Sequence, residues 1–319
     1  MARELSASAL ISGVVIAGHG RHLVVRCEGD PYDQMRQAVT RGRRDDCCVG
    51  DRVKLRAMAS DQAVIESIEP RLNCVSRSDG GRTKLLASNI DQAAIVISGD
   101  PPFSEALLMR ALSVLHAQRV PALIIATKTD LHAAHARIEG RLTLYKSLGY
   151  QVVPISVTGE AEAARAALQP HLKDRCTLLL GQSGMGKSTL INLLVKDAAQ
   201  ATREISRALS TGRHTTSFCR MFTIDAWGNA PAMGPQAQES LIIDSPGFQL
   251  FGLAHLSSSQ LMHALPDVAR WLGQCRFSNC SHRDEPGCLV SEAVRRGEVD
   301  AMRLRFYRDM LAETEQPVR

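Results

Sequence analysis

The sequence predicts a multidomain protein of 319 residues, with an N-terminal β-barrel, a central α/β domain and a mainly helical C-terminal domain that binds a metal. Three observations predict this division. Short apolar strands fill the first part of the chain, apolar runs alternate with helical segments in the middle, and cysteines gather near the end. We place the domain boundaries at 1–72, 73–254 and 255–319.

The composition is that of an ordinary folded protein. Hydrophobic residues make up 45% and charged residues 22%, which argues against global disorder. No apolar run approaches the roughly 20 residues of a membrane-spanning helix, and the start MARELSASALISG lacks the pattern of a signal peptide. The net charge of +5 permits a nucleic-acid partner without requiring one. We expect a cytoplasmic monomer without a membrane partner.

The N-terminal region has clear strand patterns at 12–18, 22–28, 51–58 and 63–69, separated by turns rich in Gly and Asp. About five short strands favour a small closed barrel; we favour the OB-fold, with another small β-domain as the alternative. Six basic residues lie close together here: Arg41, Arg43, Arg44, Arg52, Lys54 and Arg56. Asp45, Asp46 and Asp51 partly cancel their charge, so on charge alone a solvated loop is slightly favoured over a nucleic-acid surface.

The central region reads as a doubly wound α/β domain. Continuous apolar runs at 93–99, 121–130, 151–157, 176–184 and 239–247 end at polar loops, as buried parallel strands do. Helical spacing of apolar residues over 104–119 separates the first two runs. In such a sheet the ligand lies at the carboxyl ends of the strands.

The segment CTLLLGQSGMGKSTLINLLV contains the pattern G-x-x-x-x-G-K-S between an apolar strand and a helix, which is the context of a phosphate-binding P-loop. Its glycines let backbone N–H groups face the phosphates. We expect Lys187 to reach the β- and γ-phosphates and Ser188 to ligate Mg²⁺. The residues expected around the nucleotide are Gly181, Gln182, Ser183, Gly184, Met185, Gly186, Lys187, Ser188 and Thr189.

Two downstream segments add the parts that phosphoryl transfer requires. LIIDSPG ends a strand with Asp244, which is placed to hold Mg²⁺ directly or through water, and the Gly247 N–H can contact the γ-phosphate. Between the P-loop and this strand lies TGRHTTSF, a candidate switch loop in which Thr215 or Thr216 completes the Mg²⁺ shell. The sequence does not choose between the two threonines.

A candidate base-recognition loop precedes the P-loop. In the usual motif N-K-x-D, the aspartate accepts hydrogen bonds from the guanine N1–H and N2 amino group, and the lysine stem packs on the base. The segment Thr127-Lys128-Thr129-Asp130 matches this motif at a strand end, except that Thr127 replaces the asparagine, and Ser156 in VPISVTG supplies the second base contact. Adenine lacks both donors in that arrangement, so Asp130 would discriminate against it.

The order of these loops is unusual, because in ordinary GTPases both base loops follow the P-loop. The spatial order of strands survives if the old termini are joined and new ones open elsewhere. We therefore expect a circular permutation of the GTPase fold. A mechanical hypothesis follows: because the segment after Asp244 leads directly into the C-terminal region, switch movement is passed to that region through the backbone.

The C-terminal stretch CRFSNCSHRDEPGC predicts a metal centre. Its four candidate ligands are Cys275, Cys280, His282 and Cys288, in the spacing C-x4-C-x-H-x5-C. Three thiolates and an imidazole suit tetrahedral zinc and leave no open position for catalysis, so we expect a structural site. Nine cysteines, an odd number, suit a reducing compartment with a metal site better than a disulfide framework.

Taken together, the motifs resemble the RsgA family of small ribosomal subunit biogenesis GTPases. The barrel region is followed by TKTD and ISV, then by GQSGMGKST, RHTT and DSPG, and then by the cysteine cluster, with SNIDQAAIV and FGLAHL around the core. The resemblance implies an OB-fold domain, a permuted GTPase domain and a zinc-binding domain. It also implies binding to the 30S subunit and its 16S rRNA late in maturation, with GTP hydrolysis stimulated by the subunit and coupled to release.

The switch region departs from many GTPases. Phe248 follows Gly247, where many GTPases carry a glutamine that orients the attacking water, so we expect slow intrinsic turnover until a partner helps. His214 is a candidate for the missing polar role, and a loop histidine that only contacts RNA is the alternative. Basic residues that could neutralise rRNA phosphates are Arg203, Arg207, Arg213, Arg220, Arg71, Arg77, Arg82 and Lys84. Two rival classes remain: a P-loop ATPase or kinase, and an RNA-binding assembly factor in which nucleotide only sets the conformation.

Overall fold

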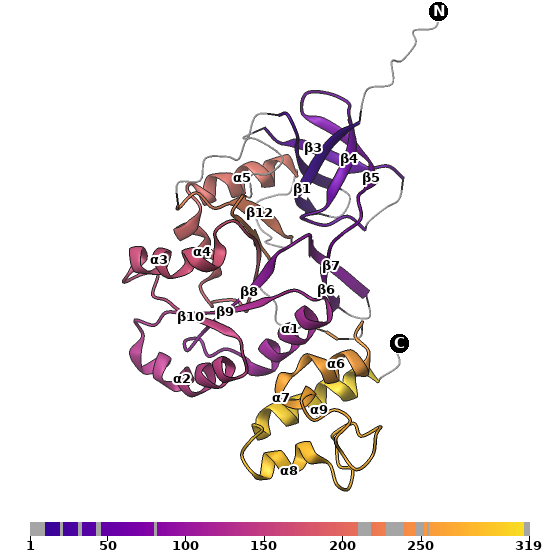
Figure 1. Ribbon diagram of the computed structural model, residues 1–319. Helices are drawn as coiled ribbons and strands as arrows, with labels where there is room; N and C mark the ends of the chain where they lie inside the picture. Colours follow the sequence, from indigo (N-terminus) through magenta and orange to yellow (C-terminus); the bar gives the residue numbers. More distant parts are fainter. Residues whose placement is uncertain are drawn as a thin grey trace, which may run out of the picture.

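The computed structural model describes residues 10–19, 22–30, 34–42, 46–79, 82–209, 218–227, 239–246, 252–253 and 255–315. Three parts follow one another along the chain. Figure 1 shows the N-terminal barrel and the C-terminal helices on opposite sides of the central domain. None of the helices within the described ranges combines the length and the apolar character that crossing a bilayer requires.

The N-terminal part is a five-stranded barrel, as predicted. Its strands are β1 (Ile11–His19), β2 (His22–Cys27), β3 (Arg36–Thr40), β4 (Arg52–Ala57) and β5 (Gln62–Ile68). They pair in the order β1-β2-β3-β5-β4, and β4 closes the barrel by pairing with β1. Alternate side chains such as Val25, Val53 and Leu55 fill the interior. Strand β3 was missed because only Ala38 in its five residues is buried, which leaves no alternating pattern.

A hairpin that we did not predict joins the barrel to the central domain. It consists of β6 (Cys74–Asp79) and β7 (Arg82–Ser88). The carboxylate of Asp51, on the barrel side, is fully buried and accepts hydrogen bonds from the Arg71 guanidinium at 2.6 and 2.8 Å and from the Ser88 hydroxyl at 2.6 Å. These contacts fix the hairpin against the base of the barrel.

The central sheet has the strand order β10-β9-β8-β11-β13-β12. The strands are β8 (Gln92–Ser98), β9 (Ala122–Thr127), β10 (Gln151–Pro154), β11 (Cys176–Leu180), β12 (Arg220–Thr223) and β13 (Leu241–Asp244). All are parallel except β12, which pairs antiparallel with β13 on one side and with β1 of the barrel on the other. The barrel and the central sheet are therefore hydrogen-bonded into one continuous sheet.

Helices connect and cover the central strands. They are α1 (Glu105–Ala117), α2 (His132–Ser147), α3 (Ala161–Leu172), α4 (Lys187–Leu194) and α5 (Ala198–Ala208). Strands β8 and β11 are buried at every position, as expected for strands covered on both faces. The strand that leads into the P-loop, β11, lies between β8 and β13, although β8, β9 and β10 all precede it in the chain. This is the permuted arrangement that the motif order predicts.

The C-terminal part contains α6 (Ser258–Ala264), α7 (Pro266–Ala269), α8 (Leu289–Arg295) and α9 (Ala301–Thr314), and the cysteine-rich stretch lies between α7 and α8. Helix α6 begins with a capping box, in which the Ser257 hydroxyl accepts from the Gln260 N–H and the Gln260 side chain accepts from the Ser257 N–H. Helices α6 and α9 pack against α1.

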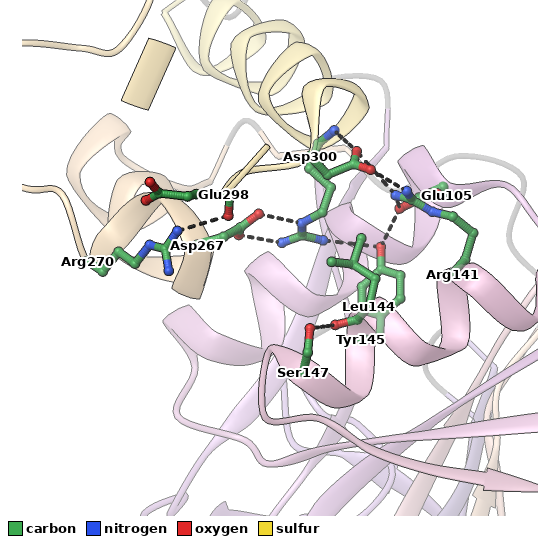
Figure 2. A network of polar contacts seen from close by, with 10 residues as sticks. Glu105, Arg141, Leu144, Tyr145, Ser147, Asp267, Arg270, Glu298 and Asp300 are labelled. Atoms are coloured by element: carbon green, nitrogen blue, oxygen red, sulfur yellow. Dashed lines mark hydrogen bonds and ion pairs between the residues drawn. The ribbon is translucent and has the colours of Figure 1, made fainter. Parts of the chain in front are cut away.

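A network of polar contacts fixes the C-terminal part to α1 and α2 (Figure 2). Arg303 of α9 is fully buried and donates to Asp267 of α7 at 2.7 and 2.8 Å and to the Tyr145 hydroxyl of α2 at 3.2 Å. Beside it, Arg141 of α2 forms ion pairs with Glu105 and, at 2.6 Å, with Asp300. The C-terminal part is thus held by side-chain contacts to the central domain, in addition to the backbone connection that we expected.

Candidate nucleotide site and metal centre

The P-loop lies at the carboxyl end of β11 and leads into α4. Two of its glycines have left-handed backbone conformations, with φ of +81° at Gly184 and +92° at Gly186, which residues with a Cβ rarely adopt. The third, Gly181, has no room for a side chain, because a Cβ there would lie 2.6 Å from the Val96 carbonyl oxygen. Helix α4 begins at Lys187, so its free N–H groups open toward the loop.

The charged groups predicted for the phosphate end lie together. The Lys187 ammonium donates to the carbonyl oxygens of Gly181 at 2.6 Å and Gln182 at 3.0 Å. Burial lowers the pKa of Lys187, and the Asp244 carboxylate on the neighbouring strand opposes this shift. Burial raises the pKa of Asp244, while the positive charges of Lys187 and Arg220 oppose the rise. Ser188 and Thr189 are exposed at the start of α4.

The candidate base loop touches the P-loop directly. The Thr127 hydroxyl lies 2.7 Å from the Met185 carbonyl oxygen and 3.2 Å from the Ile97 carbonyl oxygen, and it donates to the closer of them. Thr127 is buried, and Gly186 approaches it so closely that a Cβ there would lie 3.4 Å from the hydroxyl oxygen. A threonine in place of the usual asparagine therefore still connects the two loops.

Asp130 and Ser156 meet at the outer end of this site. The Ser156 hydroxyl donates to the Asp130 carboxylate at 2.7 Å and accepts from the Gly159 N–H at 3.2 Å. Asp130 itself is exposed to solvent. Lys128, with φ of +59°, donates through its ammonium to the Asp100 carbonyl oxygen at 2.8 Å. The sequence predicts these groups on one side of the molecule, and they do share one edge of the sheet with Lys187.

The structure adds neighbours that the motifs did not indicate. The Gln182 side chain accepts from the Ser104 N–H at 2.7 Å, so the P-loop also contacts the start of α1. The ring of Pro101 lies 3.1 Å from where a Cβ on Gly184 would stand. The DPP sequence after the first predicted strand signals a turn here, although not its contact with the P-loop. Arg220, expected near rRNA phosphates, is 7% exposed and faces the Asp244 side of the site instead.

Other basic residues of the barrel region are paired with acids. Glu66 of β5 accepts from Arg41 at 2.7 Å and lies 3.3 Å from Arg56, and Lys54 lies 3.2 Å from Glu69. Arg71 is held by Asp51 as described above. Within the part of the barrel region that the structure describes, these four basic residues therefore offer less free positive charge than the sequence suggests.

Several predicted residues lie outside the described ranges. They are His214, Thr215, Thr216, Gly247 and Phe248 of the nucleotide site, and the basic residues Arg43, Arg44 and Arg213. The described strands on either side of the candidate switch loop, β11 and β12, both lie next to β13, whose last residue is Asp244.

The four predicted metal ligands converge. The His282 Nδ1 atom lies 3.6 Å from the Sγ atoms of Cys275, Cys280 and Cys288, and all four ligand atoms lie within 4.8 Å of one another. Around a tetrahedral zinc ion, a nitrogen and a sulfur ligand at their usual bond lengths are about 3.6 Å apart. The donor set and its spacing therefore fit a Cys3His zinc site, and all nine cysteines of the chain are free of disulfides.

Comparisons with known proteins decide the family. A family model described as RsgA GTPase matches residues 68–254. A protein from Ralstonia pickettii named small ribosomal subunit biogenesis GTPase RsgA is 45% identical over 95% of this chain and 93% of its own length. One of the same name from Paraburkholderia phymatum is 45% identical over 97% of this chain and 93% of its own length. The chain belongs to the RsgA GTPase family.

Solved structures agree with this assignment. The structure of YloQ, described as a circularly permuted GTPase, matches with a TM-score of 0.65 and 27% identity over 99% of both chains. YjeQ from Thermotoga maritima has the same fold, with a TM-score of 0.70 over 97% of this chain and all of the other, at 23% identity. As a member of the RsgA GTPase family, the chain is a GTP hydrolase with a permuted order of motifs, which confirms the predicted fold class and enzyme class. The predicted domain boundaries and the roles of single residues stay predictions.

Proposed function

We propose that this RsgA-family member acts in late maturation of the small ribosomal subunit, where it binds the 30S particle through 16S rRNA and hydrolyses GTP to GDP and phosphate. The nucleotide-binding part of the proposal rests on the contact between the Thr127 hydroxyl and the Met185 carbonyl, which joins the base loop to the phosphate loop. Relatives at 45% identity over nearly the whole chain carry the name of a small ribosomal subunit biogenesis GTPase. We further propose a cytoplasmic monomer.

Guanine is recognised by Asp130 in this proposal. Its carboxylate accepts hydrogen bonds from the base N1–H and N2 amino group, and the Ser156 hydroxyl holds the other side of that carboxylate in place. The Lys128 stem packs on the base, while Thr127 keeps the loop in register with the P-loop. An adenine would leave the Asp130 carboxylate without donors.

The phosphates are bound by the P-loop backbone over 181–189 and by Lys187, whose ammonium exchanges its carbonyl partners for β- and γ-phosphate oxygens. Ser188 and Asp244 hold Mg²⁺, which neutralises charge on the β- and γ-oxygens when bound. Residues outside the described ranges complete the proposed site: Thr215 or Thr216 on Mg²⁺, the Gly247 N–H on the γ-phosphate, and His214 near the attacking water. Cys275, Cys280, His282 and Cys288 hold one structural Zn²⁺.

GTP turnover with and without purified small subunits tests the function. We expect slow turnover alone and a strong increase with the subunit, abolished by Lys187→Ala. Asp130→Asn is expected to shift preference from GTP to XTP, because an amide can donate to the xanthine carbonyl. Turnover that is indifferent to the subunit would contradict the ribosomal assignment, and an unchanged base preference would contradict the role of Asp130.

The same measurements separate the rival classes. Equal competition by ATP and GTP would indicate a P-loop ATPase or kinase. Normal subunit maturation by Lys187→Ala would indicate an assembly factor that uses nucleotide only as a conformational ligand. Equal subunit-stimulated rates for wild type and His214→Ala would remove His214 from the mechanism.

A further inference from the structure

Arg220 occupies a position that none of the recognised motifs explains. It is the first residue of β12, the strand that joins the barrel to the central sheet. Its backbone is in register with Ala17 of β1 on one side and with Asp244 of β13 on the other. One residue thus lies directly between the barrel and the carboxylate proposed to hold Mg²⁺.

The register also places the side chains. Residues directly opposite each other on antiparallel strands project from the same face of the sheet, with Cβ atoms roughly 5 Å apart. The side chains of Arg220 and Asp244 therefore project from the same face of the sheet, on neighbouring strands that pair directly. Asp244 is also in register with Leu179 of β11, the strand that leads into the P-loop, and the positive charge of Lys187 opposes the rise in the pKa of Asp244.

The Arg220 guanidinium is held in this environment. It is 7% exposed, and its Cζ atom lies 4.4 Å from the centre of the Phe218 ring, a distance typical of a cation–π contact. An exposed arginine side chain is mobile, whereas this one is stacked on a ring and largely shielded from solvent. Shielding strengthens its electrostatic effect on neighbouring groups, since the effective dielectric constant falls with burial.

We propose that Arg220 acts on Mg²⁺ through Asp244: as a competing cation beside this carboxylate, it weakens the binding of Mg²⁺, so that tight binding requires the negative charge of nucleotide phosphates. The inference rests on the proposed role of Asp244 as a Mg²⁺ ligand. A buried cation beside a metal ligand repels the metal, so the ion binds tightly only when phosphate oxygens add negative charge. Arg220 would thereby make metal binding depend on nucleotide.

Two substitutions separate charge from structure. Arg220→Gln removes the charge and keeps much of the side-chain volume, whereas Arg220→Lys keeps the charge. The measurement is the Mg²⁺ concentration that half-saturates binding of a fluorescent GDP analogue to the full-length protein, followed at fixed ionic strength. A matched control is Arg137→Gln, which removes an exposed arginine from α2 of the same domain.

We expect Arg220→Gln to lower the half-saturating Mg²⁺ concentration by about tenfold, because one buried positive charge is removed from beside the site. Arg220→Lys and Arg137→Gln are expected to stay within about twofold of wild type. An unchanged or higher value for Arg220→Gln would overturn the proposal, and so would equal shifts for the glutamine and lysine variants. Thermal unfolding of each variant shows whether the Phe218 stack is needed for stability. If Arg220 had only a structural role, its substitution would lower the unfolding temperature without changing the Mg²⁺ dependence.

Asp244→Asn keeps the two proposals distinguishable. If nucleotide binding by Asp244→Asn shows the Mg²⁺ dependence of wild type, then Asp244 is not the ligand and the proposed site fails. If that variant loses its Mg²⁺ dependence while Arg220→Gln behaves as wild type, the site stands and only the role of Arg220 is refuted.

Discussion

The buried ion pair between Arg303 and Asp267 offers a direct test of how the C-terminal part is held. Arg303 is fully buried and Asp267 is 4% exposed, and the two share hydrogen bonds of 2.7 and 2.8 Å. Arg303 also donates to the Tyr145 hydroxyl of α2 at 3.2 Å, so one guanidinium connects α9, α7 and the central domain. The perturbation is Arg303→Ala.

The size of the effect follows from this burial. Removing the guanidinium leaves the Asp267 carboxylate buried without its charged partner, and breaking such a pair typically costs about 3–5 kcal/mol. At about 1.4 kcal/mol per factor of ten, the ratio of folded to unfolded C-terminal part falls by about two to three and a half orders of magnitude. Replacing both partners by apolar residues, as in Arg303→Met with Asp267→Leu, leaves no unpaired charge and is expected to restore stability to within about 1 kcal/mol of wild type.

Urea unfolding measures both variants, and the two tryptophans separate the parts. Trp227 lies in the central domain and Trp271 in the C-terminal part, so Trp227→Phe and Trp271→Phe backgrounds each leave one fluorescent reporter. We expect the loss of unfolding free energy in Arg303→Ala to be largest when Trp271 is the remaining reporter. A loss below about 1 kcal/mol for Arg303→Ala, or a double variant no more stable than the single one, would refute the reasoning from burial.

Three further changes probe other contacts. Thr127→Val removes the donor to the Met185 carbonyl and is expected to weaken GDP binding by about tenfold in fluorescence titrations. Thr127→Asn is expected to stay close to wild type, and equal losses for the two variants would contradict the role of Thr127 in connecting the loops. Cys280→Ser, or a strong chelator added to wild type, is expected to remove about one equivalent of zinc by metal analysis and to lower the thermal midpoint; an unchanged midpoint would argue against a structural metal. Burial would raise the pKa of Asp51, but hydrogen bonds from Arg71 and neighbouring groups outweigh it and hold this pKa below the ordinary value of 3.8. The ionised Asp51 therefore contributes its full stability above pH 3.8, and this contribution is lost as the pH falls through the lowered pKa. Asp51→Asn should therefore flatten the acid limb of unfolding free energy against pH, and an identical limb would contradict the assignment.

Much of the site was predictable because its motifs are local. The P-loop needs glycines and a lysine at fixed spacing between a strand and a helix, and Gly184 and Gly186 indeed adopt backbone conformations that favour glycine. The four metal ligands fall within fourteen residues, so a short loop can bring them together without help from the rest of the fold. The permutation could also be predicted, since it concerns only the order of the motifs along the chain.

Other elements carry too little local signal. Strand β3 buries only Ala38, and the β6–β7 hairpin mixes basic and apolar residues without a regular alternation. Strand β12 has four residues, and its assignment depends on pairing with both β1 and β13. Such strands are defined by their partners, which a pattern in one segment does not reveal.

The sequence by itself determined the three-part division, the permuted order of the GTPase motifs and the four candidate metal ligands, because each depends on residue types at short spacing. Only the tertiary structure decided that Thr127 bridges two loops, that Arg220 faces Asp244, and that Arg303 is buried against Asp267. Charged side chains are normally exposed, so nothing in their local pattern signals burial. Those contacts arise from strand register and helix docking, which join segments that lie far apart in the chain.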